Sequence, residues 1–71
     1  MGMWVDIDGS MLTRARFDED ARKMVIQFKN GAMYEYNDID EDDFQAMVNS
    51  PSPGAYFHEN IKGNYDDRRI G

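Results

Sequence analysis

The chain has 71 residues, which allow one small domain with a limited hydrophobic core. It contains no cysteine, so disulfides, thiolate nucleophiles and cysteine-bound zinc or iron–sulfur centres are excluded, and the composition fits a reducing compartment. Its net charge of −6 has the wrong sign for binding a polyanion by bulk electrostatics, so any nucleic-acid site must be a local basic patch.

The N-terminal segment, residues 1–9, predicts either a short leading strand or a frayed arm of a single domain that spans residues 1–71. It carries Trp4, Val5 and Ile7 but lacks the charged-then-apolar pattern of a signal peptide. No apolar run approaches the ~20 residues that are needed to span a bilayer. We therefore expect a cytoplasmic protein with no membrane partner.

Residues 10–17 alternate in polarity, which predicts a half-buried strand. Strict alternation places Met11, Ala15 and Phe17 on the buried side. Leu12 then lies on the other side, which it shares with Arg14, Arg16 and their outward-pointing charges.

A β-hairpin is predicted next, because alternating segments at residues 22–29 and 32–37 flank Asn30-Gly31. A two-residue loop would place Tyr34 and Tyr36 on the face of the sheet that carries Lys29. Met24, Ile26 and Phe28 would then lie on the other face. A three-residue loop with a bulge at Gly31 would instead pair the tyrosines with Ile26 and Met24, inside the core. The sequence leaves both registers open and somewhat favours the second.

Two helices follow, at residues 41–49 and 53–62. Asp40 is a suitable N-cap for the first helix, and acidic residues in its first turn complement the helix dipole. Ser52 caps the second helix with Pro53 at its first position, and Gly63 is the expected C-cap.

The acidic run before the first helix has the spacing Asp38-x-Asp40-x-Asp42, which is found in calcium loops. Asp43 stands where such a loop needs glycine, and Asn49 stands where it needs a bidentate glutamate. We expect no metal site and no cofactor.

These elements predict an α+β fold, in which a three-stranded antiparallel meander is followed by two short helices packed on one face. The predicted core consists of the apolar residues that share the buried side of these elements: Met11, Ala15, Phe17, Met24, Ile26, Phe28, Phe44, Met47, Val48, Phe57 and Ile61.

The order and spacing of several residues resemble one known family. These residues are, in chain order, Phe28, Gly31, Tyr34, Tyr36, Ile39, Phe44, the block 52–57, Ile61 and Tyr65. Together they make residues 10–70 similar to the KTSC domain family, which is named for its occurrence at the C-terminus of some lysyl-tRNA synthetases. The chain departs from the family pattern at Asp40, where proline is usual, and at Pro53, where lysine is usual.

The resemblance implies a small bacterial or phage protein of unestablished activity, and the synthetase fusion implies RNA binding. Loss of the lysine at Pro53 weakens an anion-binding role for the turn that it occupies.

No catalytic constellation is visible in the sequence. His58 is the single histidine, and no serine or cysteine nucleophile pattern accompanies it. Caps and solvated loops account for nearly all of the carboxylates. We therefore expect no enzyme.

A binding role has more support, because aromatic rings interleaved with cations on a sheet are a common way to hold single-stranded RNA. The expected ligand is single-stranded RNA or a nucleotide, and the free N–H groups after Ser52 offer a seat for a phosphate. The residues expected to bind it are Tyr34, Tyr36, Arg14, Arg16, Lys29, Ser52, Gly54 and Lys62.

An alternative role follows from the acidic runs at residues 18–20 and 38–43. They present a negative surface that would suit a phage or bacterial inhibitor with a basic protein partner. The sequence leaves open whether the protein is a monomer or a small homo-oligomer.

Overall fold

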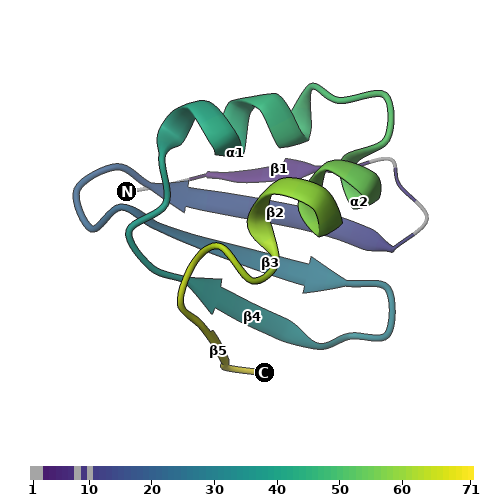
Figure 1. Ribbon diagram of the computed structural model, residues 1–71. Helices are drawn as coiled ribbons and strands as arrows, with labels where there is room; N and C mark the ends of the chain where they lie inside the picture. Colours follow the sequence, from purple (N-terminus) through teal and green to yellow (C-terminus); the bar gives the residue numbers. More distant parts are fainter. Residues whose placement is uncertain (1–2, 8, 10) are drawn as a thin grey trace.

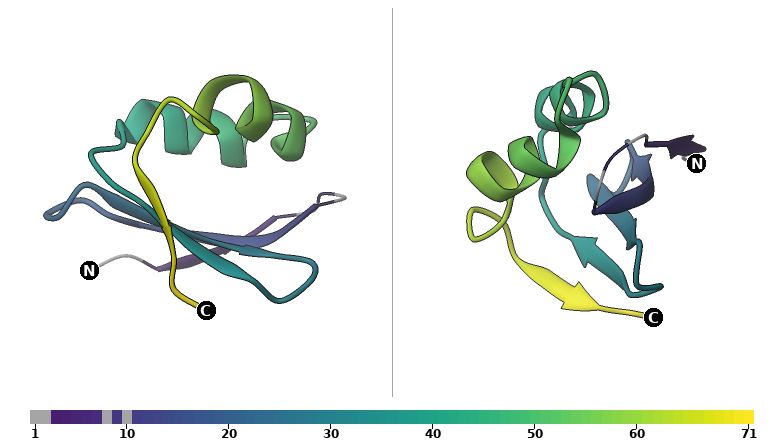
Figure 2. Two further views of the ribbon diagram at one scale, coloured as in Figure 1. Left: turned by 60° about the horizontal axis from the view of Figure 1, so that its bottom comes forward. Right: turned by 90° about the vertical axis from the view of Figure 1, so that its right-hand side faces the viewer.

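The computed structural model describes residues 3–7, 9 and 11–71, which form two layers (Figures 1 and 2). Within these residues an antiparallel sheet of five strands, in the order β1-β2-β3-β4-β5, carries the helices on one side. The predicted α+β class is confirmed, but the three-stranded meander is an undercount. The elements are β1 (Trp4–Asp6), β2 (Leu12–Asp18), β3 (Lys23–Phe28), β4 (Met33–Tyr36), α1 (Glu41–Val48), α2 (Pro53–Tyr56), the π-helical turn η1 (Phe57–Ile61) and β5 (Asp67–Arg69).

The two strands beyond the predicted meander lie at the two edges of the sheet (Figure 1). β1 matches one of the two alternatives for residues 1–9, the short leading strand, whereas β5 was not predicted. β1 pairs with β2, and its register places Trp4 opposite Arg16. β5 pairs with β4 after the helices have brought the chain back, and Tyr34 lies opposite Arg69. Each edge strand has three residues, which is too short for a polarity pattern, so pairing with a neighbour defines it.

The strict alternation that was predicted for residues 10–17 is interrupted by a bulge in β2. The register of β2 against β3 shifts between Leu12 and Arg14, so one extra residue is accommodated there. Leu12 therefore joins Ala15 in the core and is fully buried, whereas Met11 is 37% exposed. The predictions for Leu12 and Met11 were wrong, but Arg14 and Arg16 do lie on the side away from the core.

The β3–β4 turn has three residues, as the second of the two predicted registers requires. The Phe28 N–H donates to the Ala32 carbonyl oxygen at 2.9 Å, and Gly31 has a φ of +91°, which glycine tolerates best. Ile26 therefore faces Tyr34, and Met24 faces Tyr36. Both tyrosines lie on the helix-covered side, here called the inner face.

The core fills the space between the inner face and the helices. Phe17 stacks on Phe44 across the two layers, with ring centroids 5.4 Å apart. Met11 excepted, the predicted core is confirmed, with Phe28 and Val48 packing at its margin. Buried apolar residues that the prediction did not include are Ile7, Leu12, Val25, Ala32, Tyr36 and Ile39.

Both helices begin where the sequence places them, but neither capping side chain forms a capping bond. The Asp40 carboxylate instead accepts a hydrogen bond from Arg22 at 2.9 Å. The Ser52 backbone carbonyl accepts the Tyr56 N–H at 3.0 Å. Asp40 and Ser52 therefore occupy the predicted N-cap positions, but the prediction that their side chains cap the helices was wrong.

The second helix widens along its length. Its last turn, η1, is π-helical, and the Lys62 N–H donates to the Phe57 carbonyl oxygen five residues back at 2.8 Å. The C-cap is Lys62 rather than the predicted Gly63. Gly63 follows it with a φ of +85°, in a turn that the Asn64 N–H closes on the Ile61 carbonyl oxygen at 3.0 Å. Phe57 and Ile61 are both buried.

Asp43 in α1 joins the helices to the segment that leads into β5. Its carboxylate accepts hydrogen bonds from the Tyr56 hydroxyl at 2.8 Å and from the Tyr65 hydroxyl. The bond that each hydroxyl donates to Asp43 raises its own pKa, and the pKa of Tyr65 rises to about 12. The acidic start of α1 therefore has a structural role beyond the helix dipole.

Candidate nucleic-acid interface

The residues that the sequence predicts as one binding site lie in four separate places. Arg14 and Arg16 lie on the side of the sheet away from the helices, here called the outer face. The others are divided between two clefts, apart from Lys29, which is exposed in the β3–β4 turn. Tyr34, Tyr36 and Lys62 line one cleft, and Ser52 and Gly54 line the other.

Trp4 organises the two arginines on the outer face. The guanidinium carbon of Arg14 lies 4.1 Å from the centroid of the Trp4 ring, and that of Arg16 lies 5.2 Å from it. The Arg14 Nε also donates to the Gln27 Oε1 at 2.6 Å, which fixes the orientation of its guanidinium. Both guanidinium groups lie over the indole, where cation–π attraction holds them, and such cations can also contact phosphates.

The outer face has more cations than acids, in contrast to the chain as a whole. Glu35 is shared between Lys23, at 3.8 Å, and Arg68, at 3.7 Å. By the strand register, the charged residues of the described part of this face are the cations Arg14, Arg16, Lys23 and Arg68 and the acids Asp6, Asp18 and Glu35. The described part of this face thus has an excess of one positive charge, four cations against three acids, whereas the chain as a whole has a net charge of −6.

The first cleft, here called the β5 cleft, lies between η1 and the β4–β5 edge of the sheet and has a volume of about 390 Å³. Aromatic side chains and charged side chains line it together. The residues on which its chemistry depends are Phe28, Tyr34, Phe57, Lys62, Asp67 and Arg69.

Tyr36 lies deepest in the β5 cleft and is only 2% exposed. Burial raises the pKa of its hydroxyl, and the Asp67 carboxylate raises it further. Its ring packs edge-on against Phe57, with centroids 5.6 Å apart. Tyr36 is therefore a core residue, and of the two tyrosines Tyr34 has the more accessible ring.

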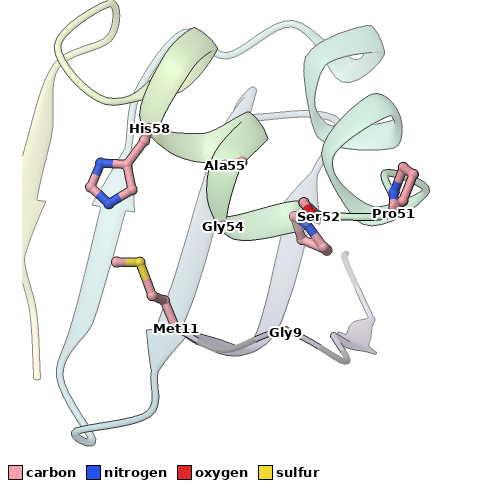
Figure 3. Close-up of a pocket in the computed structure, with 8 residues that line it drawn as sticks. Gly9, Met11, Pro51, Ser52, Gly54, Ala55 and His58 are labelled. Carbon is pink, nitrogen blue, oxygen red and sulfur yellow. The ribbon is translucent and has the colours of Figure 1, made fainter.

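The second cleft, here called the α2 cleft, lies between the start of α2 and the connection from β1 to β2 (Figure 3). It has a volume of about 500 Å³, and Met11 and His58 extend into it from opposite walls (Figure 3). Among the described residues no lysine or arginine lines it, and Lys62 belongs to the β5 cleft instead. The predicted phosphate seat at Ser52 and Gly54 thus lacks the cation expected to flank it.

Neither a metal site nor a membrane-spanning helix is found in the part of the chain that the structure describes. Residues 3–7, 9 and 11–71 hold no group of three histidine or acidic side chains that is arranged to bind a metal ion. No helix within those ranges has the length and apolar character to cross a membrane.

Comparisons with known proteins define the family of the chain. The chain belongs to the KTSC domain family, which matches residues 8–65. A KTSC domain protein from Yersinia pestis has a similar structure, with a TM-score of 0.91 and 29% sequence identity over 100% of both chains.

Two curated relatives are lysine–tRNA ligases, from Trichormus variabilis and from Nostoc sp. Each is 31% identical to this chain over 58 residues, which are 82% of the chain and 10% of the ligase. The chain therefore corresponds to about a tenth of the length of these enzymes.

The sequence did not identify Trp4 as a binding residue. Its position in a three-residue strand gives no pattern, and only the pairing of β1 with β2 brings it to Arg14 and Arg16. One signal was available, because Trp4-x-Asp6 and Arg14-x-Arg16 share the two-residue spacing of strand residues on one face.

Proposed function

We propose that this KTSC domain is a non-enzymatic module that binds single-stranded RNA on the outer face of its sheet, around Trp4. The observation that carries the proposal is the arrangement of Arg14 and Arg16 at 4.1 and 5.2 Å from the Trp4 ring. Bases would stack on the indole, and the guanidinium groups would contact phosphates.

The surroundings of Trp4 support this proposal. The helices cover only the inner face, so the strands of the outer face are open to an extended ligand (Figure 2). The two curated relatives are named lysine–tRNA ligases, and a tRNA is part of that name, which supports an RNA ligand. Binding to RNA and the absence of cysteine both agree with a cytoplasmic location.

An inhibitor role through the acidic runs has less support, because several of these carboxylates are engaged within the protein. Asp18 accepts the backbone N–H groups of Asp20 and Ala21, and Asp40 pairs with Arg22. Asp43 is occupied by two tyrosine hydroxyls. A basic protein partner would have to compete with these contacts.

The test is a fluorescence titration, because Trp4 is the only tryptophan of the chain. A short unlabelled single-stranded RNA should quench its emission, and the affinity should fall as salt is raised. Each lost phosphate contact should reduce the slope of log K against log salt by about 0.7. Unchanged emission at low salt, with no binding in a parallel anisotropy assay, would contradict the proposal.

Variants locate the interface. With labelled RNA, Trp4→Ala should weaken binding by the ~1–3 kcal/mol of one stacked base. Arg14→Ala and Arg16→Ala should each weaken binding and reduce the salt slope. The matched control is Arg22→Ala, which removes the same charge from an arginine that is held by Asp40 and should leave binding unchanged. An equal loss for all three arginine variants would indicate a non-specific charge effect.

A further inference from the structure

The β5 cleft is a second site, on the opposite side of the sheet from Trp4. The register of β4 against β5 shows this, because Tyr36 pairs with Asp67 and Tyr34 pairs with Arg69. All four side chains therefore lie on the inner face. The neighbouring Arg68 faces Glu35 on the outer face. Alternate residues of β5 thus belong to two different surfaces.

Aromatic rings form the wall of the cleft. Phe28 packs edge-on against Tyr34, with centroids 5.7 Å apart at 83°, and against Phe57, at 5.5 Å and 72°. Tyr34 and Phe28 are partly buried, so their rings are supported by the core and still reach the cleft. A volume of about 390 Å³ falls within the usual range of small-molecule sites, and an aromatic wall suits a planar ring.

Two cations lie at this wall. Lys62 comes from the end of η1, and Arg69 comes from β5. The Arg69 Nε donates to the Gly71 carbonyl oxygen at 2.9 Å, which orients the guanidinium and leaves its terminal N–H groups for a ligand. Neither cation forms a salt bridge with a described residue, whereas the nearby Arg68 pairs with Glu35.

Asp67 gives the cleft a hydrogen-bond acceptor beside these donors. A carboxylate repels a simple aromatic anion, but it accepts hydrogen bonds from hydroxyl or amino groups. A ligand that matches the whole lining therefore has a planar ring, hydroxyl or amino donors and a negatively charged group.

We propose that the β5 cleft binds a nucleoside monophosphate group. Its base lies against Phe28 and Tyr34, and its phosphate is held by Lys62 and Arg69. Asp67 accepts hydrogen bonds from the ribose hydroxyls or from an amino group of the base. The group is either a free nucleotide or the phosphorylated end of an RNA, and this site does not require RNA binding at Trp4.

The test is an amide NMR titration of the whole chain with AMP, with adenosine and inorganic phosphate as separate probes. AMP should shift the resonances of Tyr34, Lys62 and Arg69, and each partial probe should bind at least tenfold more weakly. Trp4 fluorescence should not change. Equal affinity for phosphate and AMP, or shifts confined to the outer face, would overturn the proposal.

Arg69→Met and Arg68→Met are a matched pair, because the two arginines are neighbours in β5 and face opposite sides. Arg69→Met should weaken AMP at least tenfold, and Arg68→Met should leave it within twofold. Equal losses would overturn the proposal. If Arg69→Met alters the fold, Lys62→Met, at an exposed position after the last helical turn, provides the same comparison.

A third arm distinguishes the source of the ligand. A short RNA with a 5′-phosphate is compared with the same RNA without it, and shifts in the β5 cleft are followed. AMP should shift these resonances in either case, so additional shifts with the phosphorylated RNA alone of the two RNAs identify an RNA end, and shifts with AMP but with neither RNA identify a free nucleotide. No shift with either ligand would overturn the proposal, whatever the result at Trp4.

Discussion

The inner and outer faces of the sheet are built from the same strands but become buried in different ways. Ile26, on the inner face, is fully buried beneath the helices. Val25, its neighbour on the outer face, is only 4% exposed although no helix covers it. Arg16 and Glu35 lie opposite Val25 on either side, and the apolar parts of such side chains can cover it. A sheet with one helical layer can therefore complete its second face with long charged residues.

The largest expected effect comes from testing this difference directly. Ile26→Ala should reduce the free energy of unfolding by about 2–5 kcal/mol, because it leaves a cavity between the two layers. Val25→Ala should cost only about 1–2 kcal/mol, since two methyl groups are removed beneath side chains that can move. Urea denaturation of both variants provides the measurement. Equal losses would show that the outer face is packed as rigidly as the core.

A smaller loss of stability is expected from changes in the β3–β4 turn, whose length places both tyrosines on the inner face. Gly31→Ala should cost about 1–2 kcal/mol, because Gly31 has a φ of +91° that a Cβ disfavours. Space does not limit the substitution, since no atom lies within 4 Å of the added Cβ position. Gly31→Asn should cost less, because asparagine tolerates a positive φ better. Thermal denaturation should give the order wild type, Asn, Ala, and identical melting temperatures would argue against the bulged turn.

Tyr65 tests how the helical layer is attached to the chain segment before β5. Its pKa of about 12 in the folded protein exceeds the ordinary value of about 10 because the protonated hydroxyl donates to Asp43. The stabilisation from this bond is complete below pH ~10 and is lost as the pH rises through 12. Tyr65→Phe should cost about 1 kcal/mol at neutral pH, since the variant loses one partly buried hydrogen bond and keeps the ring.

The measurement at alkaline pH is the more specific part of this test. Stability of the wild type should fall more steeply between pH 10 and 12 than that of Tyr65→Phe, as measured by urea denaturation at each pH. Tyr36 and Tyr56 also have raised pKa values, so the variant should retain part of the decline. Parallel curves would contradict a stabilising bond from Tyr65.

The smallest stability change is expected on the outer face. Glu35→Gln removes partners of Lys23 and Arg68, and exposed ion pairs contribute only about 0–1 kcal/mol. The same change removes an acid from the proposed RNA-binding face. We expect unchanged thermal stability and tighter RNA binding at low salt. Weaker binding would show that Glu35 orients the cations rather than opposing the ligand.

Much of the fold was predictable because local patterns and packing agree. The strands around Ile26 and Tyr34, the acidic start of α1 and the Ser52-Pro53 start of α2 all lie where the sequence placed them. The presence of Gly31 was enough to suggest a three-residue bulged turn as one of two alternatives. The sequence could not choose between them, because the choice depends on the core, which gains both tyrosines in the bulged register.

The remaining features depend on contacts between distant segments. β1 and β5 exist through pairing, and the bulge before Arg14 reverses the direction of Leu12 without any local signal. The same limit applied to the candidate binding residues. The sequence placed Arg14 and Arg16 on the outer face, but the aromatic ring beside them is Trp4, and Tyr34 and Tyr36 lie on the other face.

The π-helical turn before Lys62 has a consequence for comparing members of the family. The bond from the Lys62 N–H to the Phe57 carbonyl oxygen spans five residues, whereas the corresponding bond of an α-turn spans four. A relative one residue shorter between Phe57 and the lysine could therefore close an ordinary α-turn and keep both side chains in nearly the same directions. When family members are aligned, a one-residue gap belongs inside this turn, so that the lysine stays matched to Lys62.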